Sequence, residues 1–180
     1  MKLLFVGVAV IFALWLGTVF LSVQPSLPNV TQTQTSYSGA LSISFSYPKI
    51  YSLTERTDSY EGNPITVLTL IDSHVVIPDM SEGPQDISVI EVPNPANLSL
   101  TDWVKQKSIS NFNLSPDQVL SSTTLAGEPA VAYRHSGLYE SEAVAAEHHG
   151  KIYLLSVGSV DASDQIYKDF HRLLQTVEFK

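Results

Sequence analysis

The residues best suited to bind a metal ion are histidines and a glutamate in the last third of the chain. Glu147, His148 and His149 are consecutive, and His135 lies on the segment before them. Carboxylate and imidazole groups are ligands that Zn²⁺ accepts. Because successive side chains of a strand point to opposite faces, His148 and His149 can share one metal only if the strand bends there. We interpret them as exposed hairpin residues and assign no metal ligand; a metal site near His135 and His149 is the alternative.

A serine and a lysine have the spacing of a nucleophile and its base. Ser46 and Lys49 match S-x-x-K, but that chemistry requires the serine at the start of a helix. Here the serine lies in an alternating strand pattern, and Pro48 separates the pair. The sequence contains no G-x-S-x-G, H-E-x-x-H, P-loop or G-x-G-x-x-G motif, and no cysteine that could act as a nucleophile. We therefore assign no catalytic residue and no cofactor, and expect a protein that is not an enzyme.

Acidic residues flank one loop of the chain, namely Asp72, Asp79, Glu82 and Asp86. Ca²⁺ prefers carboxylate and carbonyl oxygens, but the EF-hand loop needs its ligands at fixed positions, and these four residues lack that spacing. We interpret the segment as a solvated acidic loop.

An uninterrupted apolar run from Leu3 to Val23 precedes all of these candidates. As a helix of 1.5 Å rise per residue, it would cross the hydrocarbon core of about 30 Å. A signal peptide has an apolar region of only about 7–15 residues and a small-residue cleavage site, which this run does not match. Since only the α-amino group and Lys2 precede the run, the N-terminus is expected in the cytoplasm. We predict that residues 1–23 form a retained single-pass membrane anchor, with secretion after cleavage as the alternative.

Charge and cysteine content restrict the partners of the remaining chain. Residues 39–180 contain 9 basic and 18 acidic side chains, a formal charge of −9. Such a domain is repelled by phosphate backbones and by anionic lipid head groups, which excludes nucleic acid as an expected partner. The chain has no cysteine, so no disulfide can stabilise the fold and no lipid-modified cysteine can attach the chain to a membrane. Its stability must come from the hydrophobic core.

Residues 24–38 separate the apolar run from the rest. The segment QPSLPNVTQTQTSYS is uncharged and rich in Pro, Ser, Thr and Gln, without hydrophobic periodicity. Such a composition buries too little apolar surface to offset chain entropy, so we predict a flexible linker. One extracytoplasmic domain, residues 39–180, follows it.

Alternating and continuous apolar patterns predict the strands of this domain. Leu41 to Tyr47 alternates apolar and serine residues, as a half-buried strand does. The segments 65–71 and 151–157 are apolar on both faces and are expected to be central strands. Further strands are predicted at 51–55, 86–92, 118–125, 129–135 and 143–149.

Two helices are predicted from caps and periodicity. Ser99 and Asp102 have the spacing of a capping box, with Asp102 reaching back to the backbone of Ser99, and a short helix through Trp103 follows. The last helix carries an apolar stripe from Ile166 to Val177 and is expected to start at Asp161 as its N-cap. The predicted fold class is α+β, an antiparallel sheet between helices.

Several segments together resemble the PsbP-like family of extrinsic photosystem II subunits and exported bacterial relatives. They are ISFSYPK at 43–49, GEPA at 127–130, GKIY at 150–153 and FHRLLQTVEF at 170–179. The resemblance implies an α-β-α sandwich around an antiparallel sheet, in proteins that dock onto complexes and support their cofactors without catalysing a reaction. No functional residue of the photosystem subunit matches a motif of this chain, and the predicted anchor departs from the soluble form.

These observations together favour a membrane-anchored, non-enzymatic domain that docks onto a membrane complex or an envelope protein. The alternative is a small-ligand or metal-binding module that uses a groove near His135 and His149. The membrane, through the N-terminal helix, and a protein are the expected partners.

Overall fold

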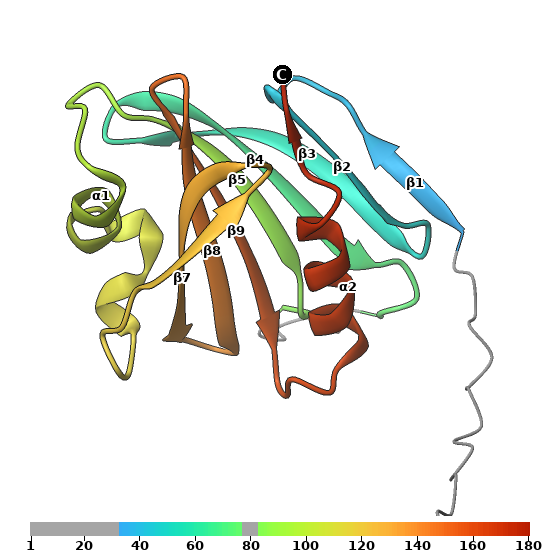
Figure 1. Ribbon diagram of the computed structural model, residues 1–180. Helices are drawn as coiled ribbons and strands as arrows, with labels where there is room; N and C mark the ends of the chain where they lie inside the picture. The colour runs from blue at the N-terminus through green and yellow to red at the C-terminus, as the bar shows by residue number, and fades with distance from the viewer. Residues whose placement is uncertain (1–32, 77–82) are drawn as a thin grey trace, which may run out of the picture. The chain divides into compact units, whose positions relative to one another are not determined.

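The fold is built on an antiparallel sheet of seven strands, in a computed structural model that describes residues 33–76 and 83–180 (Figure 1). The strand order is β3-β4-β5-β9-β8-β7-β6, and every pair is antiparallel. The strands are β3 (Tyr51–Tyr60), β4 (Asn63–Asp72), β5 (Ile87–Pro93), β6 (Ser121–Leu125), β7 (Glu128–Ser136), β8 (Glu140–His148) and β9 (Lys151–Ser159).

Strand β9 lies in the middle of this sheet, as its continuous apolar pattern predicts. Ile152 and Leu154 belong to the core on one face, while Tyr153 and Leu155 belong to the core on the other. Strand β4 is buried on both faces in the same way, through Leu68 and its neighbours. Both predictions of a central strand are confirmed.

One face of the sheet is covered by helix α2 (Gln165–Leu174) and by a second, three-stranded sheet (Figure 1). The small sheet consists of β1 (Gln34–Tyr37), β2 (Ile43–Pro48) and β10 (Glu178–Phe179), with β2 in the middle. Phe170 and Leu173 of α2 are fully buried, and Ile43 and Phe45 of β2 fill the same core. The apolar stripe predicted for the last helix is therefore its packing surface.

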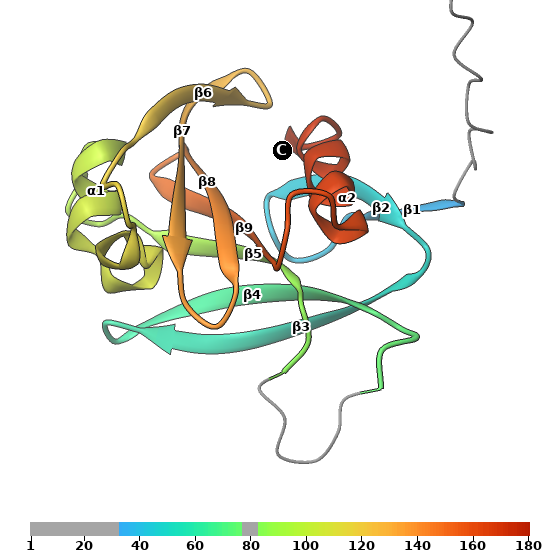
Figure 2. The ribbon, with the colours of Figure 1, turned by 90° about the horizontal axis from the view of Figure 1, so that it is seen from below.

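The other face is covered by helix α1 (Leu100–Gln106) and two 3₁₀ segments, η1 (Ser108–Ser110) and η2 (Phe112–Leu114). Figure 2 shows α1 and α2 on opposite sides of the sheet. Trp103, Val104 and Phe112 are buried in the core of this second face. The structure thus supports the predicted α+β class, in which an antiparallel sheet lies between helices; the three-stranded sheet on the α2 face was not predicted.

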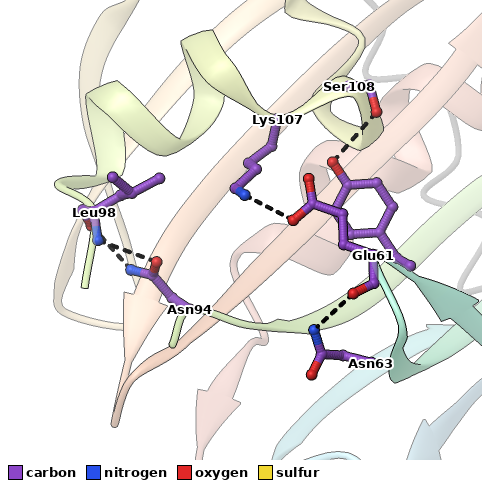
Figure 3. Close-up of polar contacts among 7 residues, drawn as sticks. Glu61, Asn63, Asn94, Leu98, Lys107 and Ser108 are labelled. Carbon is purple, nitrogen blue, oxygen red and sulfur yellow. Dashed lines mark hydrogen bonds and ion pairs between the residues drawn. The ribbon is translucent and has the colours of Figure 1, made fainter. Parts of the chain in front are cut away.

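The β3–β4 hairpin and the β5–α1 connection fix the position of α1 (Figure 3). Lys107, at the end of α1, pairs with Glu61 of the hairpin at 2.7 Å, and Tyr60 contacts Ser108 at 3.3 Å. The side chain of Asn94 closes the connection by bonding both backbone groups of Leu98, at 2.9 and 3.1 Å. These contacts hold α1 over one half of the sheet face.

The caps of the two helices differ from prediction in detail. Ser99 caps α1 by accepting from the backbone N–H of Asp102, as predicted, but the Asp102 carboxylate accepts from the Ser99 hydroxyl instead of from its backbone. Asp is one methylene shorter than the Glu of the usual motif, which explains the shorter reach. Helix α2 begins after Asp164, not Asp161. Asp161 instead accepts from the backbone N–H of Ser163 in the turn before the helix.

The predicted boundary between linker and domain at residue 38 is wrong, because β1 lies inside the predicted linker. Tyr37 is buried, stacks on Phe45 with ring centroids 5.2 Å apart, and accepts a bond from the backbone N–H of Leu41 at 3.2 Å. A Cβ on Gly39 would lie 2.5 Å from the Tyr37 hydroxyl, so the small residue permits this packing. The buried ring of Tyr37 and pairing with the edge of β2 order β1, although the composition of this segment predicts flexibility.

The predicted anchor, residues 1–23, and linker residues 24–32 lie outside the described residues, so the anchor stays a prediction. Within 33–76 and 83–180, none of the helices has the length and apolar character needed to cross a membrane.

Replacing Tyr37 with alanine should lower the free energy of unfolding by about 3 kcal/mol, since a buried aromatic is removed from a closed core. Replacing the exposed Gln34 of the same strand should change it by less than about 0.5 kcal/mol. Urea unfolding of both variants measures this difference. Equal stability of Y37A and the unaltered chain would mean that β1 is not part of the folded domain.

Candidate functional site

The sheet face beneath α1 changes from apolar to polar along its strands. Residues directly opposite one another on neighbouring strands share a face, so each row across the sheet can be read from the pairing. The row under α1 is apolar and consists of Ile90, Leu154, Ala145 and Val131. The next row contains Ser88, Ser156, Ala143 and Tyr133. The chemistry of the face therefore turns polar where the helix no longer covers it.

The third row is the most polar and crosses the sheet from Asp86 to His135. The backbone N–H of Gly158 bonds the carbonyl of Asp86 at 3.0 Å, Gly158 pairs with Ser141, and Ser141 pairs with His135. Gly158 has no side chain and Ser141 has a short one. The middle of this row therefore leaves space above the backbone of the sheet. A cleft of about 400 Å³ lies over it, hereafter the His135 cleft.

The walls of the His135 cleft come from the 3₁₀ segments and from the β7–β8 loop. Ile109, Asn111 and Leu114 line one side, and Leu138 and Tyr139 line another. The Tyr139 hydroxyl donates to the carbonyl of Gly83 at 2.8 Å.

The 3₁₀ wall is held to the sheet by Tyr133. Its hydroxyl donates to the carbonyl of Ser110 at 2.7 Å, and its ring meets Phe112 edge-on at 5.4 Å. The Ser110 hydroxyl in turn lies 2.6 Å from the carbonyl of Val104 in α1. The cleft is thus built on a rigid sheet and closed by segments with fixed hydrogen bonds.

His135 is 9% exposed, and its Nδ1 has no hydrogen-bond partner among the described residues. Burial lowers the pKa of His135, while the nearby Glu140 carboxylate acts weakly in the opposite direction. The imidazole is therefore neutral at pH 7. A buried polar group without a partner costs about 1–3 kcal/mol, so the buried Nδ1 of His135 lowers the stability of the fold.

Asp86 lies at the other end of the same row. Burial raises the pKa of its carboxyl group, and the positive charge of Arg56 partly offsets this. Among the described residues no hydrogen bond or ion pair involves the carboxylate of Asp86, unlike buried Asp169, which accepts from Tyr51, Gln165 and Arg172. Asp86 is thus a half-buried acid without a neutralising contact in the described part of the chain.

The structure separates the histidines that the sequence groups together. On β8, Ser141 lies opposite His135, whereas His148 is at the other end of the strand and pairs with Lys151. His135 shares the α1 face with Tyr133, while His148 stacks on Phe179 on the opposite side. A single groove containing both His135 and His149 is therefore wrong, because the pairing register places them at opposite ends and faces of the sheet.

His148 and His149 do lie together, because the strand bends there. His149 has a φ of 50° in the turn before Gly150, and the two rings stack with centroids 3.9 Å apart. The side chain of His148 is only 15% exposed and pairs with Glu128 at 3.0 Å, so the interpretation as an exposed residue holds for His149 alone. Within the described ranges there is no cluster of three or more His, Cys, Asp or Glu side chains that could hold a metal ion.

The remaining candidates are dispersed. Ser46 lies on β2, where its hydroxyl contacts Ser36 at 3.2 Å. Asp72 accepts from the backbone N–H of His74, whereas Asp86 lines the cleft. Asp79 and Glu82 lie outside the described residues.

A second hollow of about 450 Å³ adjoins the His135 cleft, hereafter the Val76 hollow. Pro84 and Tyr139 line both. Its other lining residues include Ile50, Asp72, Val75, Val76, Asp164 and Ile166. Val75 and Val76 are 47% and 86% exposed, so an apolar surface lies open at this end of the sheet.

The comparisons with known proteins concern the fold. The sequence matches no protein-family model and no curated protein. Among solved structures, the chain is similar to the solution structure of cyanobacterial PsbP (CyanoP) from Synechocystis sp. PCC 6803, with a TM-score of 0.53 and 14% identity over 88% of this chain and 99% of that one. The chain has a PsbP-like fold. At this identity the likeness extends to the fold alone.

The sequence points to His135 but not to the other residues that line its cleft. In the sequence Asp86 belongs with the loop acids, and no motif singles out Ser88, Ser141 or Ser156. One signal was present: Ser156 and Gly158 interrupt an otherwise apolar central strand at alternate positions. Small or polar residues on one face of a buried strand indicate a cavity or a close approach there.

Lowering the pH from 7.5 to 5 should destabilise the protein through His135. The folded state holds its pKa below the ordinary value of 6.5, so the unfolded chain binds the proton more readily and stability falls as pH drops through 6.5. The H135L variant, of similar volume, should lose less stability over the same range. Thermal unfolding of both chains at each pH measures the difference, and parallel pH profiles would contradict the buried neutral state.

Proposed function

We propose that this chain is a non-enzymatic, membrane-anchored domain that faces the extracytoplasmic side and docks onto a protein of the same membrane. The observation that carries the proposal is the position of the exposed valines beside the point where the chain enters the folded domain.

Strand β1 starts at the end of the molecule that bears the Val76 hollow. Gln34 pairs with Pro48, and the backbone N–H of Lys49 bonds the carbonyl of Thr33 at 2.8 Å. The next residue, Ile50, lines the Val76 hollow. The entry point of the chain and the open apolar surface are thus neighbours.

The length of chain before β1 limits how far this end can lie from a membrane. If residues 3–23 span the bilayer, residues 24–32 connect the span to the domain and reach at most about 30 Å. The end with Val75 and Val76 is then held close to the membrane surface. Tethering at this distance raises the effective concentration of the domain around a membrane partner to the millimolar range, which assists docking without any new contact.

The charges of the Val76 hollow favour a protein over lipid as the partner. Asp72 and Asp164 line it, and its described lining contains no lysine or arginine. Anionic lipid head groups would be repelled by this surface. A protein with an apolar patch and basic side chains around it would complement both the valines and the carboxylates.

Site-specific cross-linking in intact cells tests the docking surface. A photo-reactive amino acid at Val76 of the full chain should give a cross-linked product with a membrane protein. The same group at Ala126, an exposed position in the turn before β7 at the opposite end of the sheet, is the matched control and should give no such product. The V76D substitution in a chain labelled at Val75 should reduce the yield at least fivefold.

Two further results decide between the parts of the proposal. Replacing residues 1–23 with a cleavable signal peptide should lower the Val76 product, because the tether is lost. Equal products from Val76 and Ala126, or products with lipid alone, would contradict docking through this end. Hydrolytic turnover by the purified chain would contradict the non-enzymatic part.

A further inference from the structure

The His135 cleft has the features of a binding site rather than of an ordinary surface depression. It lies over a rigid sheet, has defined walls, and contains a nine-tenths buried imidazole whose Nδ1 has no partner in the described part of the chain. A neutral imidazole offers one N–H donor and one acceptor nitrogen. The hydroxyls of Ser88, Ser141 and Ser156 add both functions along the floor.

The charge of the residues that line the His135 cleft favours a ligand of one charge over the other. Asp86 is the one carboxylate among the described residues that line the cleft, and these residues include no lysine or arginine. Outside the lining, Glu140 acts electrostatically on His135, and Arg56 of β3 acts on Asp86. Within the cleft itself, an anion would meet Asp86 without a positive charge to offset it, whereas a cation would pair with it in a partly desolvated setting.

Size and apolar walls narrow the ligand further. A volume of about 400 Å³ lies in the range of small-molecule sites. The apolar wall residues are Ile90, Ile109, Leu114, Leu138 and Leu154. Such walls favour a hydrocarbon body, while Asp86 and His135 lie at opposite ends of one row and can fix its polar groups.

We propose that the His135 cleft binds a small organic amine in its protonated form, with the ammonium group on Asp86, the hydrocarbon part against the leucine and isoleucine walls, and a second polar group of the ligand hydrogen-bonded to His135. This activity is separate from docking through the Val76 hollow, although Tyr139 lines both cavities.

Three probes of nearly the same shape test the proposal, each with a hydroxymethyl group that can bond His135: 4-(aminomethyl)cyclohexanemethanol (the amine), 1,4-cyclohexanedimethanol (the alcohol) and 4-(hydroxymethyl)cyclohexanecarboxylate (the carboxylate). Binding to the full chain in uncharged detergent is measured by calorimetry, and the histidine ring nitrogens are followed by NMR. The amine should bind at least tenfold more tightly than the alcohol, and the carboxylate should not bind. The His135 ring signals should shift, while those of His74, His148, His149 and His171 serve as internal controls.

Variants separate charge from shape. D86N should weaken amine binding at least tenfold and leave alcohol binding within twofold. D58N, which removes an exposed carboxylate on β3, is the matched control and should change neither. S156L fills the floor of the cleft and should abolish binding of both the amine and the alcohol.

Several outcomes would overturn the proposal. They are equal binding of amine and carboxylate, amine binding unchanged in D86N, ring shifts at other histidines but not at His135, and no binding of any probe. If D86N fails to fold, the charge selectivity of the unaltered chain and the S156L result decide the question. Cross-linking from Val76 should be unaffected by S156L, so failure here is distinguishable from failure of docking.

Discussion

Burial of β9 on both faces is the constraint on which the rest of the structure depends. Its side chains alternate between two separate cores, so neither face of the sheet can be left to solvent along the whole strand. One face requires α2 and the three-stranded sheet, and the other requires α1 with the 3₁₀ segments. Because the domain has no disulfides, its stability depends mainly on the apolar surface buried in these two cores.

The cleft exists because this constraint relaxes at one end of β9. After Leu154, the next residues of β9 on the α1 face of the sheet are Ser156 and Gly158. Several of their neighbours on β5, β7 and β8 are polar as well. The cover also ends there, since α1 is held over the other half of the face by Glu61 and Asn94. Asp86 and His135 are therefore desolvated without being paired in the described part of the chain, a combination that costs stability and is typical of functional sites.

The small sheet links the fold to the way the chain is presented. Strand β1 joins β2 through Tyr37, and its first residue lies at the same end of the main sheet as both cavities. A tether attached there restricts the orientation of the domain as well as its distance from an attachment point. The proposed docking end and the proposed ligand cleft are consequently adjacent, which leaves room for one partner to contact both.

Local patterns were sufficient for much of this fold. The alternation around Phe45, the continuous apolar runs of β4 and β9, the Ser99 cap and the stripe of α2 each depend on neighbours in sequence, and each predicted element is present. Residues 33–38 were a harder case, because β1 is ordered by long-range pairing that its composition does not reveal. The candidate site was harder still. The sequence places His135 near His148 and far from Asp86, but strand register reverses this, since antiparallel pairing brings together residues at distant positions and separates those on one long strand. By itself the sequence determined the charge and most of the elements, and it predicts an anchor; only the tertiary structure decided which side chains meet, because burial and pairing are properties of the assembled sheet.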